Sequence, residues 1–373
     1  MLSTQVIDDP AALAPHLEAW DALAVAHGRP FCAPAWMLAW WREGRTGETR
    51  LRVVLVHDDG ELVAVAPFFA QVGRFGLAEY RLLAAGFSHR IGVLARAGTE
   101  QAVARPLAQA LETLDPPPAA VVFEGVDRDD PWPALLRAAW PGRLKPQQRR
   151  DVEMEAPWIE VGGDFDGWFA RRGKGYRKQT RRADRRLTEE QVQTRVTREP
   201  AAVETLMRLH HQRWDEQGGS AVPAESGRII AEATSALPDE RIGVVLLEAP
   251  TGPIGAELAL RAGDTMAFWS GGFDPAWAHV WPGNKAMLVA LEQGAADGVL
   301  HGDLGGGTSE YKQRLADSDR PLLWCTLYPR GRQWPAIRLW RAPKHLRYAA
   351  REAVRRMPPT RQEQIRRLVR RAR

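Results

Sequence analysis

Hydrophobic and polar positions follow a recurring order in the first half of the chain. A helical segment at 34–44, rich in apolar residues, precedes two apolar runs at 51–57 and 61–69, which the short turn 58–60 joins. The turn ends in Asp-Gly, and Asp-Gly between apolar runs is a strong signal for an antiparallel hairpin. The pattern predicts a helix followed by a two-stranded hairpin.

The same order returns in the second half. A helical pattern at 203–218 precedes apolar runs at 241–249 and 253–262, with the turn 250–252 between them. A further strand region, a helix and an apolar β-run then follow in both halves; the helices are expected at about 99–114 and 284–297, and the β-runs at 119–126 and 298–306. Similar element order at similar spacing indicates a duplicated α+β unit.

Length and local sequence divide the chain into three parts. At 373 residues the chain is long for one domain and suits two. The junction is expected near 151–157, which predicts an N-terminal domain at 1–155, a C-terminal domain at 156–330 and a tail at 331–373. Each domain is expected to hold a mixed, mainly antiparallel sheet flanked by helices.

Positive charge is concentrated in the tail. The net charge is +5, but residues 330–373 hold 15 Lys and Arg against two acids, so 36 basic and 44 acidic residues are left for the rest of the chain. The tail predicts two short amphipathic helices, 344–357 and 360–372, on either side of two prolines. Such helices suit an anionic surface, either membrane headgroups or RNA; the alternative is a solvated appendage whose apolar stripe packs on the body.

Composition narrows the classes further. Apolar residues make up 45% and charged residues 26% of the chain, as in an ordinary globular protein. No apolar stretch approaches the ~18–20 residues of a membrane span, and the N-terminus lacks signal-peptide features. We therefore expect a cytoplasmic protein, with peripheral attachment at the inner membrane face as a further expectation for the tail. Cys32 and Cys325 lie far apart, which supports neither a disulfide framework nor a structural zinc site, and no metal is expected.

The segment 268–316 carries the most informative motifs. They are a strand end Phe-Trp-Ser-Gly-Gly-Phe-Asp at 268–274, a Pro-Gly turn at 282–283 that opens a helix, an Asp-containing strand at 298–306 and a Tyr-Lys pair at 311–312. This segment resembles the C-terminal half of the CelD-like GNAT acetyltransferase domain, which is associated with bacterial polysaccharide biosynthesis. The layout also looks like the Fem-type peptidyltransferases, whose tandem GNAT domains add amino acids to cell-wall precursors.

The resemblance covers roughly residues 150–330, whereas the first half shares only the element order. It implies an α+β fold of two tandem GNAT-like domains and an N-acyltransferase that moves an acyl group, normally acetyl, from acyl-CoA to an amine. The first half lacks the Pro-Gly turn and the Tyr-Lys pair, so we expect it to be a degenerate partner that frames the acceptor cleft.

A donor site is predicted where the Pro-Gly turn opens a helix. Backbone N–H groups of Gly283, Asn284 and Lys285 would point outward at the positive end of the helix dipole, a ready site for the pyrophosphate of acyl-CoA. The usual GNAT pattern, Gln/Arg-x-x-Gly-x-Gly/Ala, is not kept, since Val280 and Lys285 occupy its first and last positions. Aminoacyl-tRNA is the competing donor, and an ordinary helix start is the structural alternative.

Three residues are candidates for the chemistry. Asp303, at the end of a predicted strand, could accept the proton of an attacking amine or hold that amine in line; alternatively it caps the following glycine loop. Glu257 lies on the second hairpin strand, from which many GNAT enzymes supply a carboxylate base, although alternation leaves a solvent-facing position open. Tyr311 could protonate the leaving thiolate or hydrogen-bond the acyl oxygen.

Substrate contacts are predicted from charge and aromatic residues. Lys312 could hold a phosphate of donor or acceptor, and Arg177 and Arg181 share one face of a strongly basic helix that suits a phosphorylated or acidic substrate. Trp269 and Phe273, from the strand-end motif, are candidate platforms for a sugar or an acyl chain. A solvated surface for the charges and a core position for the rings are the alternatives.

The leading functional hypothesis is acyl transfer from acyl-CoA to a small-molecule amine, such as an amino sugar or another envelope or polysaccharide precursor. The second is Fem-like aminoacyl transfer to a cell-wall precursor, the one case in which nucleic acid is an expected partner. The third is a non-catalytic binding or scaffolding protein that uses the basic tail on a membrane surface.

Overall fold

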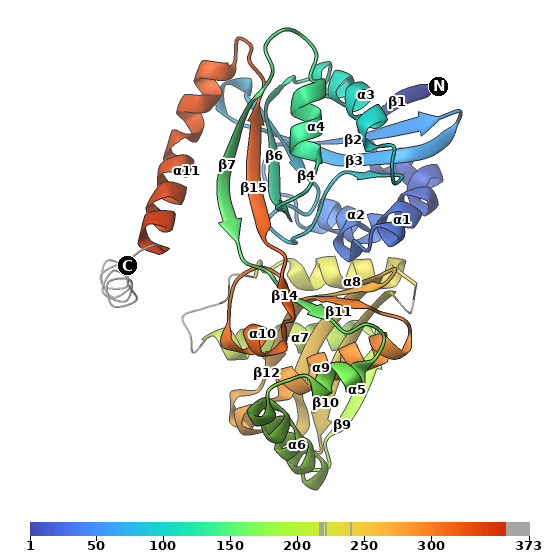
Figure 1. The fold of residues 1–373 in the computed structure, drawn as a ribbon, viewed down its shortest axis with the longest axis vertical. Helices are drawn as coiled ribbons and strands as arrows, with labels where there is room; N and C mark the ends of the chain where they lie inside the picture. The colour runs from blue at the N-terminus through green and yellow to red at the C-terminus, as the bar shows by residue number, and fades with distance from the viewer. Residues whose placement is uncertain (216–219, 221, 239–240, 356–373) are drawn as a thin grey trace.

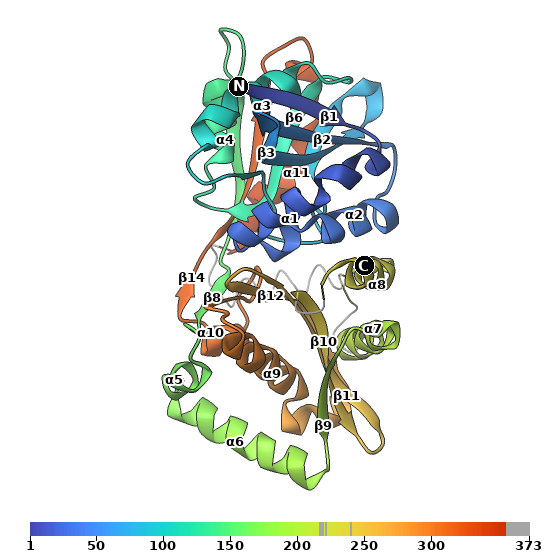
Figure 2. The ribbon, with the colours of Figure 1, turned by 90° about the vertical axis from the view of Figure 1, so that its right-hand side faces the viewer.

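The protein has two stacked lobes, each built on one mixed β-sheet (Figure 1). A computed structural model describes residues 1–215, 220, 222–238 and 241–355. Helices cover the sheet faces in both lobes, and the two sheets lie one above the other along the long axis (Figure 2). Among the described residues no helix is both long and apolar enough to cross a membrane.

The first sheet collects strands from both ends of the chain. Its order is β1 (Leu2–Ile7), β2 (Thr49–Asp58), β3 (Glu61–Val72), β4 (Ala78–Leu82), β6 (Pro118–Asp127), β15 (Leu322–Tyr328) and β7 (Gln147–Met154), and β5 (Leu94–Ala95) pairs with β3. Its helices are α1 (Leu17–Ala26), α2 (Pro34–Glu43), α3 (Glu100–Glu112), α4 (Trp132–Ala139) and α11 (Trp334–Arg355). The predicted hairpin is present as β2 and β3, and Asp59 and Gly60 at its turn both have positive φ, as a tight two-residue turn requires.

The second sheet runs in the order β14 (Ser318–Asp319), β8 (Pro157–Glu160), β13 (His301–Asp303), β12 (Thr265–Phe273), β11 (Gly252–Ala262), β10 (Ile242–Ala249) and β9 (Gln193–Thr197). Its helices are α5 (Phe165–Ala170), α6 (Lys174–Glu189), α7 (Pro200–Asp215), α8 (Ser226–Ala236), α9 (Pro282–Ala296) and α10 (Glu310–Leu315), and the 3-10 turn η5 (Pro275–Val280) precedes α9. Helix, hairpin, strand, helix and strand thus follow one another in both lobes.

The two sheets exchange strands at their boundary. The chain leaves the first sheet after Met154 and enters the second at Pro157, where β8 inserts between β13 and β14. It returns after Asp319, and β15 inserts between β6 and β7 of the first sheet. The domain division predicted at 330 assigned 322–328 to the second domain, but strand pairing places this segment in the first. An apolar run shows that a strand forms and not which sheet it joins.

Apolar packing also joins the lobes. One core cluster of buried residues extends from the first sheet and α2 to Leu206 of α7, Ile229 of α8 and Leu258 of β11. A second cluster lies between the second sheet, α5, α6 and α9. The lobes therefore share one apolar interior as well as two crossing chain segments.

The tail begins with one long helix. Residues 344–355 of the first predicted tail helix, 344–357, belong to α11, which starts earlier, at Trp334, and packs against β6 and β7. Residues 356–357 lie outside the described residues. The second predicted helix, 360–372, lies outside the described residues. A helix that starts earlier than expected reflects tertiary packing, because Ile337 is fully buried against the first sheet.

Glycines of the strand-end motif let α7 approach β12 closely. A Cβ atom added to Gly272 would overlap the backbone nitrogen of His210 and the carbonyl carbon of Leu209 on α7. Both contacts involve helix backbone, which cannot turn away as a flexible side chain can. Gly272 therefore sets the distance between α7 and the strand that carries the cavity described below.

We predict that Gly272→Ala lowers the free energy of unfolding by about 2–3 kcal/mol, because the helix must shift to relieve the overlap. Thermal or denaturant unfolding measures the change. Gly175→Ala in α6 is the matched control, since a Cβ there meets nothing within 4 Å and should leave stability unchanged or slightly raised. Equal stability of both variants would contradict the close approach.

Candidate active site

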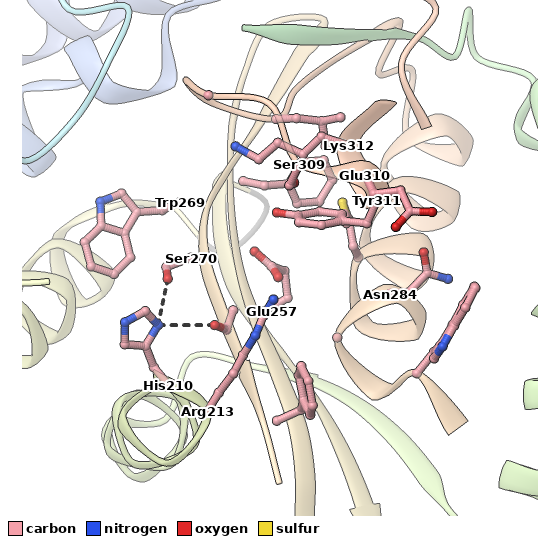
Figure 3. Close-up of a pocket in the computed structure, with 18 of the residues that line it drawn as sticks. His210, Arg213, Glu257, Trp269, Ser270, Asn284, Ser309, Glu310, Tyr311 and Lys312 are labelled. Carbon is pink, nitrogen blue, oxygen red and sulfur yellow. Dashed lines mark hydrogen bonds between the residues drawn. The ribbon is translucent and has the colours of Figure 1, made fainter. Parts of the chain in front are cut away.

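Two neighbouring strands of the second sheet separate and open a cavity. β12 and β13 pair in parallel only from Thr265 to Ala267 on one strand and His301 to Asp303 on the other. Beyond these residues β12 continues to Phe273, and a register shift against β11 places Trp269 in a bulge. A cavity of about 870 Å³ occupies the space between the outer half of β12, the loop after β13 and the start of α9 (Figure 3).

The cavity gathers most of the predicted site residues. Glu257, Trp269, Phe273, Gly283, Asn284, Tyr311 and Lys312 all line it. His210, Arg213, Trp214, Ser220 and Ser270 line the side formed by α7 and β12, and 306–310 closes the opposite side. Residues from α7, β11, β12, α9 and the segment 306–312 thus face one cavity.

Glu257 is the buried carboxylate of the cavity. It lies on β11 directly opposite Gly271 of β12, and only 7% of the residue is exposed. A Cβ at Gly271 would overlap the Glu257 carboxylate, so the glycine provides its space. Burial raises the pKa of Glu257 to about 8, while the positive charges of Arg213 and Lys312 act to lower it. The group can therefore exchange a proton near neutral pH.

Tyr311 and Lys312 follow one another at the start of α10 and reach the cavity from above Glu257 (Figure 3). Burial raises the pKa of the Tyr311 hydroxyl to about 12, and the negative charge of Glu257 raises it further. Burial lowers the pKa of Lys312, against Asp303 and Glu257, which raise it. The Lys312 ammonium donates to the carbonyl of Gly306 at 3.0 Å and so holds the glycine loop against the cavity. Tyr311 stays protonated at neutral pH and is available as a donor.

His210 belongs to a hydrogen-bonded group on the α7 side. Its Nδ1 lies 3.2 Å from the carbonyl oxygen of Gly271 and 3.0 Å from Ser270 Oγ, and its Nε2 lies 2.7 Å from Ser220 Oγ. A carbonyl can only accept, so Nδ1 carries the proton and Nε2 accepts from Ser220. Burial lowers the pKa of His210, which keeps the ring neutral. These hydrogen bonds hold α7, β12 and Ser220 in fixed positions around this side of the cavity.

The first turn of α9 presents backbone donors to the cavity. Trp281 precedes the helix with φ 54°, a left-handed conformation that turns the chain sharply into Pro282. The N–H groups of Gly283 and Asn284 have no partner within the helix, as in any first turn, and both residues line the cavity. The Asn284 side chain accepts a hydrogen bond from Tyr176 of α6 at 2.8 Å. This end of α9 has the donors and the positive dipole that an anion needs.

The structure places Asp303 behind the cavity wall and not in it. Asp303 is 2% exposed, forms a 3.0 Å ion pair with Arg90 of the first lobe and accepts from the backbone N–H of Gly305 at 2.9 Å. Asp303 caps the glycine loop, which was the alternative considered for it. It does not line the cavity, where the predicted base would have to lie. The strand-end position visible in the sequence did not show that the carboxylate would be paired from the other lobe.

Three predicted binding residues also lie elsewhere. Lys285 points back to α6 and pairs with Asp184 at 2.9 Å. Arg181 is exposed and Arg177 is half-buried on α6, and neither lines the 870 Å³ cavity. Trp269 does line it, but its indole N–H donates to the carbonyl of Phe87 at 3.1 Å, which ties the ring to the first lobe.

Arg213 is a cavity residue that the sequence interpretation missed. Its guanidinium lies 4.8 Å from the centre of the Phe273 ring. Its positive charge acts to lower the pKa of both Glu257 and Tyr311. Within the described residues it has no ion pair. The available signal was spacing, since Arg213 follows His210 by three residues and so shares its helix face.

We find no candidate metal site among the described residues: no three or more His, Cys, Asp or Glu side chains lie close enough together to hold an ion. The polar groups of the cavity are single charges, hydroxyls and backbone donors from different elements. Such a set suits the orientation of an organic substrate.

Comparisons with known proteins support a GNAT-like fold. Residues 174–313 match the sequence model of the acetyltransferase (GNAT) domain, and no curated protein matches the chain. The crystal structure of FemX has a TM-score of 0.63 at 13% identity and covers 87% of this chain and 96% of its own. A conserved protein of unknown function from Bacteroides thetaiotaomicron has a TM-score of 0.51 at 12% identity, covering 88% of this chain and all of its own.

A third solved structure is the C-terminal domain of a protein described as a lysylphosphatidylglycerol synthetase, from Agrobacterium fabrum. Its TM-score is 0.52 at 11% identity, and it covers 87% of this chain and 94% of its own. At such identities a likeness shows the fold. The predicted fold of two tandem GNAT-like domains is confirmed, and the match to the GNAT acetyltransferase domain lies within the second domain. The narrower CelD-like assignment and a degenerate first domain stay predictions.

We predict that Glu257→Gln stabilises the protein increasingly as pH rises from about 5 to about 8. The folded pKa of Glu257 lies above its unfolded value, so the folded state binds more protons and loses stability as pH rises through this window. The glutamine removes this loss, on the order of 1–4 kcal/mol at pH 8. Thermal unfolding of both proteins between pH 5 and 9 measures it, and parallel pH curves would contradict a raised pKa.

Proposed function

We propose that this protein is an N-acyltransferase that moves an acyl group from acyl-CoA to an amine. The observation that carries the proposal is the cavity between β12 and β13, where first-turn N–H groups of α9, a carboxylate with a pKa of about 8 and a protonated tyrosine face the same space. The GNAT domain family, which matches 174–313, typically uses acyl-CoA.

The donor is proposed to enter along the separated strands. Its pyrophosphate would lie at the N–H groups of Gly283 and Asn284, and its thioester would reach toward Tyr311 and Glu257. The exposed peptide edge of β12 beyond Ala267 is free of β13, which leaves strand-like hydrogen bonding available to the extended arm of the donor.

The amine would attack the thioester directly, and Glu257 and Tyr311 would accept and donate the protons of the reaction. The amine nitrogen forms a bond to the thioester carbon, Glu257 accepts the proton that the amine loses, and the carbon–sulfur bond breaks. Tyr311 donates its proton to the departing sulfur, and the proton held by Glu257 then restores the tyrosine through solvent. The negative charge of Glu257 raises the pKa of Tyr311, so the two groups lie close enough to serve one reaction centre.

We propose that the amine binds on the α7 side of the cavity, which suits an amine that also carries a negative group. Among the described residues Arg213 has no ion pair, and it lies beside Glu257, which would take the proton of the amine. A carboxylate or phosphate near the amine would pair with this guanidinium. An amino sugar or another envelope precursor with such a group is therefore the proposed acceptor class.

Aminoacyl-tRNA is the second candidate donor, favoured by α6. This helix covers the start of α9 through Tyr176, and a smaller cavity of about 540 Å³ beside it shares Tyr176 and Arg314 with the larger one. The FemX-like fold is consistent with such a donor. Titration calorimetry with acetyl-CoA and with aminoacyl-tRNA separates the two, because each donor class predicts saturable binding of one only.

We predict that Gly283→Pro weakens acetyl-CoA binding about tenfold, because it removes one N–H donor from the first turn of α9. Proline is tolerated at this end of a helix, so the fold should survive. Gly283→Ala keeps the N–H and is the control; its Cβ would lie 3.5 Å from Phe273, an ordinary contact. Equal acetyl-CoA affinity of both variants by calorimetry would remove this turn from the donor site.

We predict that Glu257→Gln lowers kcat by about 10²–10⁴-fold with little change in KM for acetyl-CoA, since the amide cannot accept a proton. In the wild type, kcat/KM should rise with pH toward a limb near pH 8, where the free carboxyl ionises, and the variant should lack this limb. Thiol release from acetyl-CoA with a panel of amino sugars measures both. Wild-type turnover with an unchanged pH profile in the variant would exclude Glu257 as the base.

A further inference from the structure

C-terminal to the buried Ile337, helix α11 has its polar and apolar faces reversed. A helix that covers a sheet normally buries its apolar face and exposes its charges. In α11 the buried positions include Arg341, at 2% exposure, and His345, at 6% exposure, whereas Leu339 and Leu346 are 77% and 70% exposed. This reversal is the feature from which the inference starts.

Polar contacts hold the inner face of α11 to the first sheet. His345 lies 2.7 Å from the Tyr328 hydroxyl and 3.0 Å from Asp151, and Arg341 lies 3.4 Å from Glu79. Lys344 adds an ion pair with Glu124 at 3.2 Å. Because these buried charges are paired, the helix is fixed in one rotation about its axis. The outward face is therefore a property of the fold and not a result of loose packing.

The outer face of α11 forms a continuous apolar stripe. Its members recur at three- and four-residue spacing and all are exposed: Ala336, Leu339, Pro343, Leu346, Ala350 and Ala353. Arg332 and Arg347 flank the stripe and are exposed too. In Figure 1 the helix lies along the outside of the first lobe, with no other described element on its outer side.

Aromatic residues continue the stripe onto the body. Trp340 is 41% exposed beside it, and a Cβ on Gly73 would lie 2.9 Å from its ring, so the loop between β3 and β4 adjoins the helix. Phe75 at the tip of this loop is 83% exposed. Tryptophan, leucine and flanking arginine are the residues that helices lying in a membrane interface present to lipid.

The positive charge of the tail favours an anionic partner for this face. Residues 330–373 hold 15 Lys and Arg against two acids, while the rest of the chain is acidic. An anionic surface would attract the tail and repel the body, whose net charge is negative. Helix α6 is also basic, but it lies at the far end of the second lobe and its apolar residues Tyr176, Ala183 and Leu187 are buried, so α11 is the basic helix that can also enter lipid. RNA phosphates would pair with the basic residues, but RNA offers no apolar surface for the exposed leucines. A second copy of the chain would place one basic surface against another, and the two would repel.

We propose that the apolar stripe of α11 docks on an anionic lipid bilayer, with Leu339 and Leu346 entering the headgroup region and the flanking arginines pairing with lipid phosphates. The stripe is too narrow and the helix too polar on its inner face to span the bilayer, so the attachment is interfacial and reversible. The docking does not depend on the acyltransferase activity and is measured without substrate.

Co-sedimentation of the full-length protein with vesicles tests the docking. The wild type should bind vesicles rich in phosphatidylglycerol, bind less as salt rises, and stay in solution with phosphatidylcholine alone. Leu339→Asp and Leu346→Asp should each weaken binding about tenfold or more, because each loses a buried leucine and adds a repelled charge. Leu300→Asp is the control, since Leu300 is 39% exposed in the second lobe, between α9 and β13, and the variant should bind as the wild type does.

Three results would overturn the proposal. One is wild-type protein that stays in solution with phosphatidylglycerol vesicles. A second is equal binding by the wild type, Leu346→Asp and Leu300→Asp, which the basic residues 356–373 alone would produce. The third is a dimer in solution that Leu346→Asp dissociates without any binding to vesicles. Thermal unfolding midpoints of the variants that match the wild type show that the fold is kept.

Discussion

The buried Arg90 guanidinium is the interaction on which the arrangement of both lobes depends. It pairs with Asp127 at the end of β6, with Asp303 at the end of β13 and with the carbonyl of Arg320 where the chain crosses back to the first sheet. Breaking a buried ion pair by removing one partner typically costs about 3–5 kcal/mol. Here the partners belong to both sheets, so this group sets where β13 ends and where the cavity begins.

The cavity forms because the outer half of β12 has no pairing with β13. β13 stops at Asp303, β12 continues alone, and a bulge at Trp269 turns its outer half toward α7. Gly271 and Gly272 then admit a carboxylate on one side and a helix backbone on the other, which no larger residue would allow. The raised pKa of Glu257 follows from the same packing, because a glycine neighbour permits burial but supplies no charge.

Sequence patterns predicted the duplicated order, the hairpins and the tandem GNAT-like fold, because each depends on local periodicity or on a short motif. They also pointed to seven residues that line the cavity, among them Glu257 and Tyr311. They could not show that Asp303 would be paired by Arg90, a residue 213 positions earlier in the chain, or that Lys285 would turn back to Asp184. Both depend on how distant elements pack, and strand exchange likewise leaves no local signal in 322–328.

The exchange of β15 also has a consequence for how the molecule is made. β7 has β15 as its neighbour in the first sheet, and β15 lies beyond the whole second lobe in the chain. A growing chain on the ribosome would expose the facing edges of β6 and β7 until the second lobe and β15 had been synthesised. The N-terminal half therefore cannot mature first as an independent unit, and a nascent chain stopped before Leu322 would present two open sheet edges that invite aggregation.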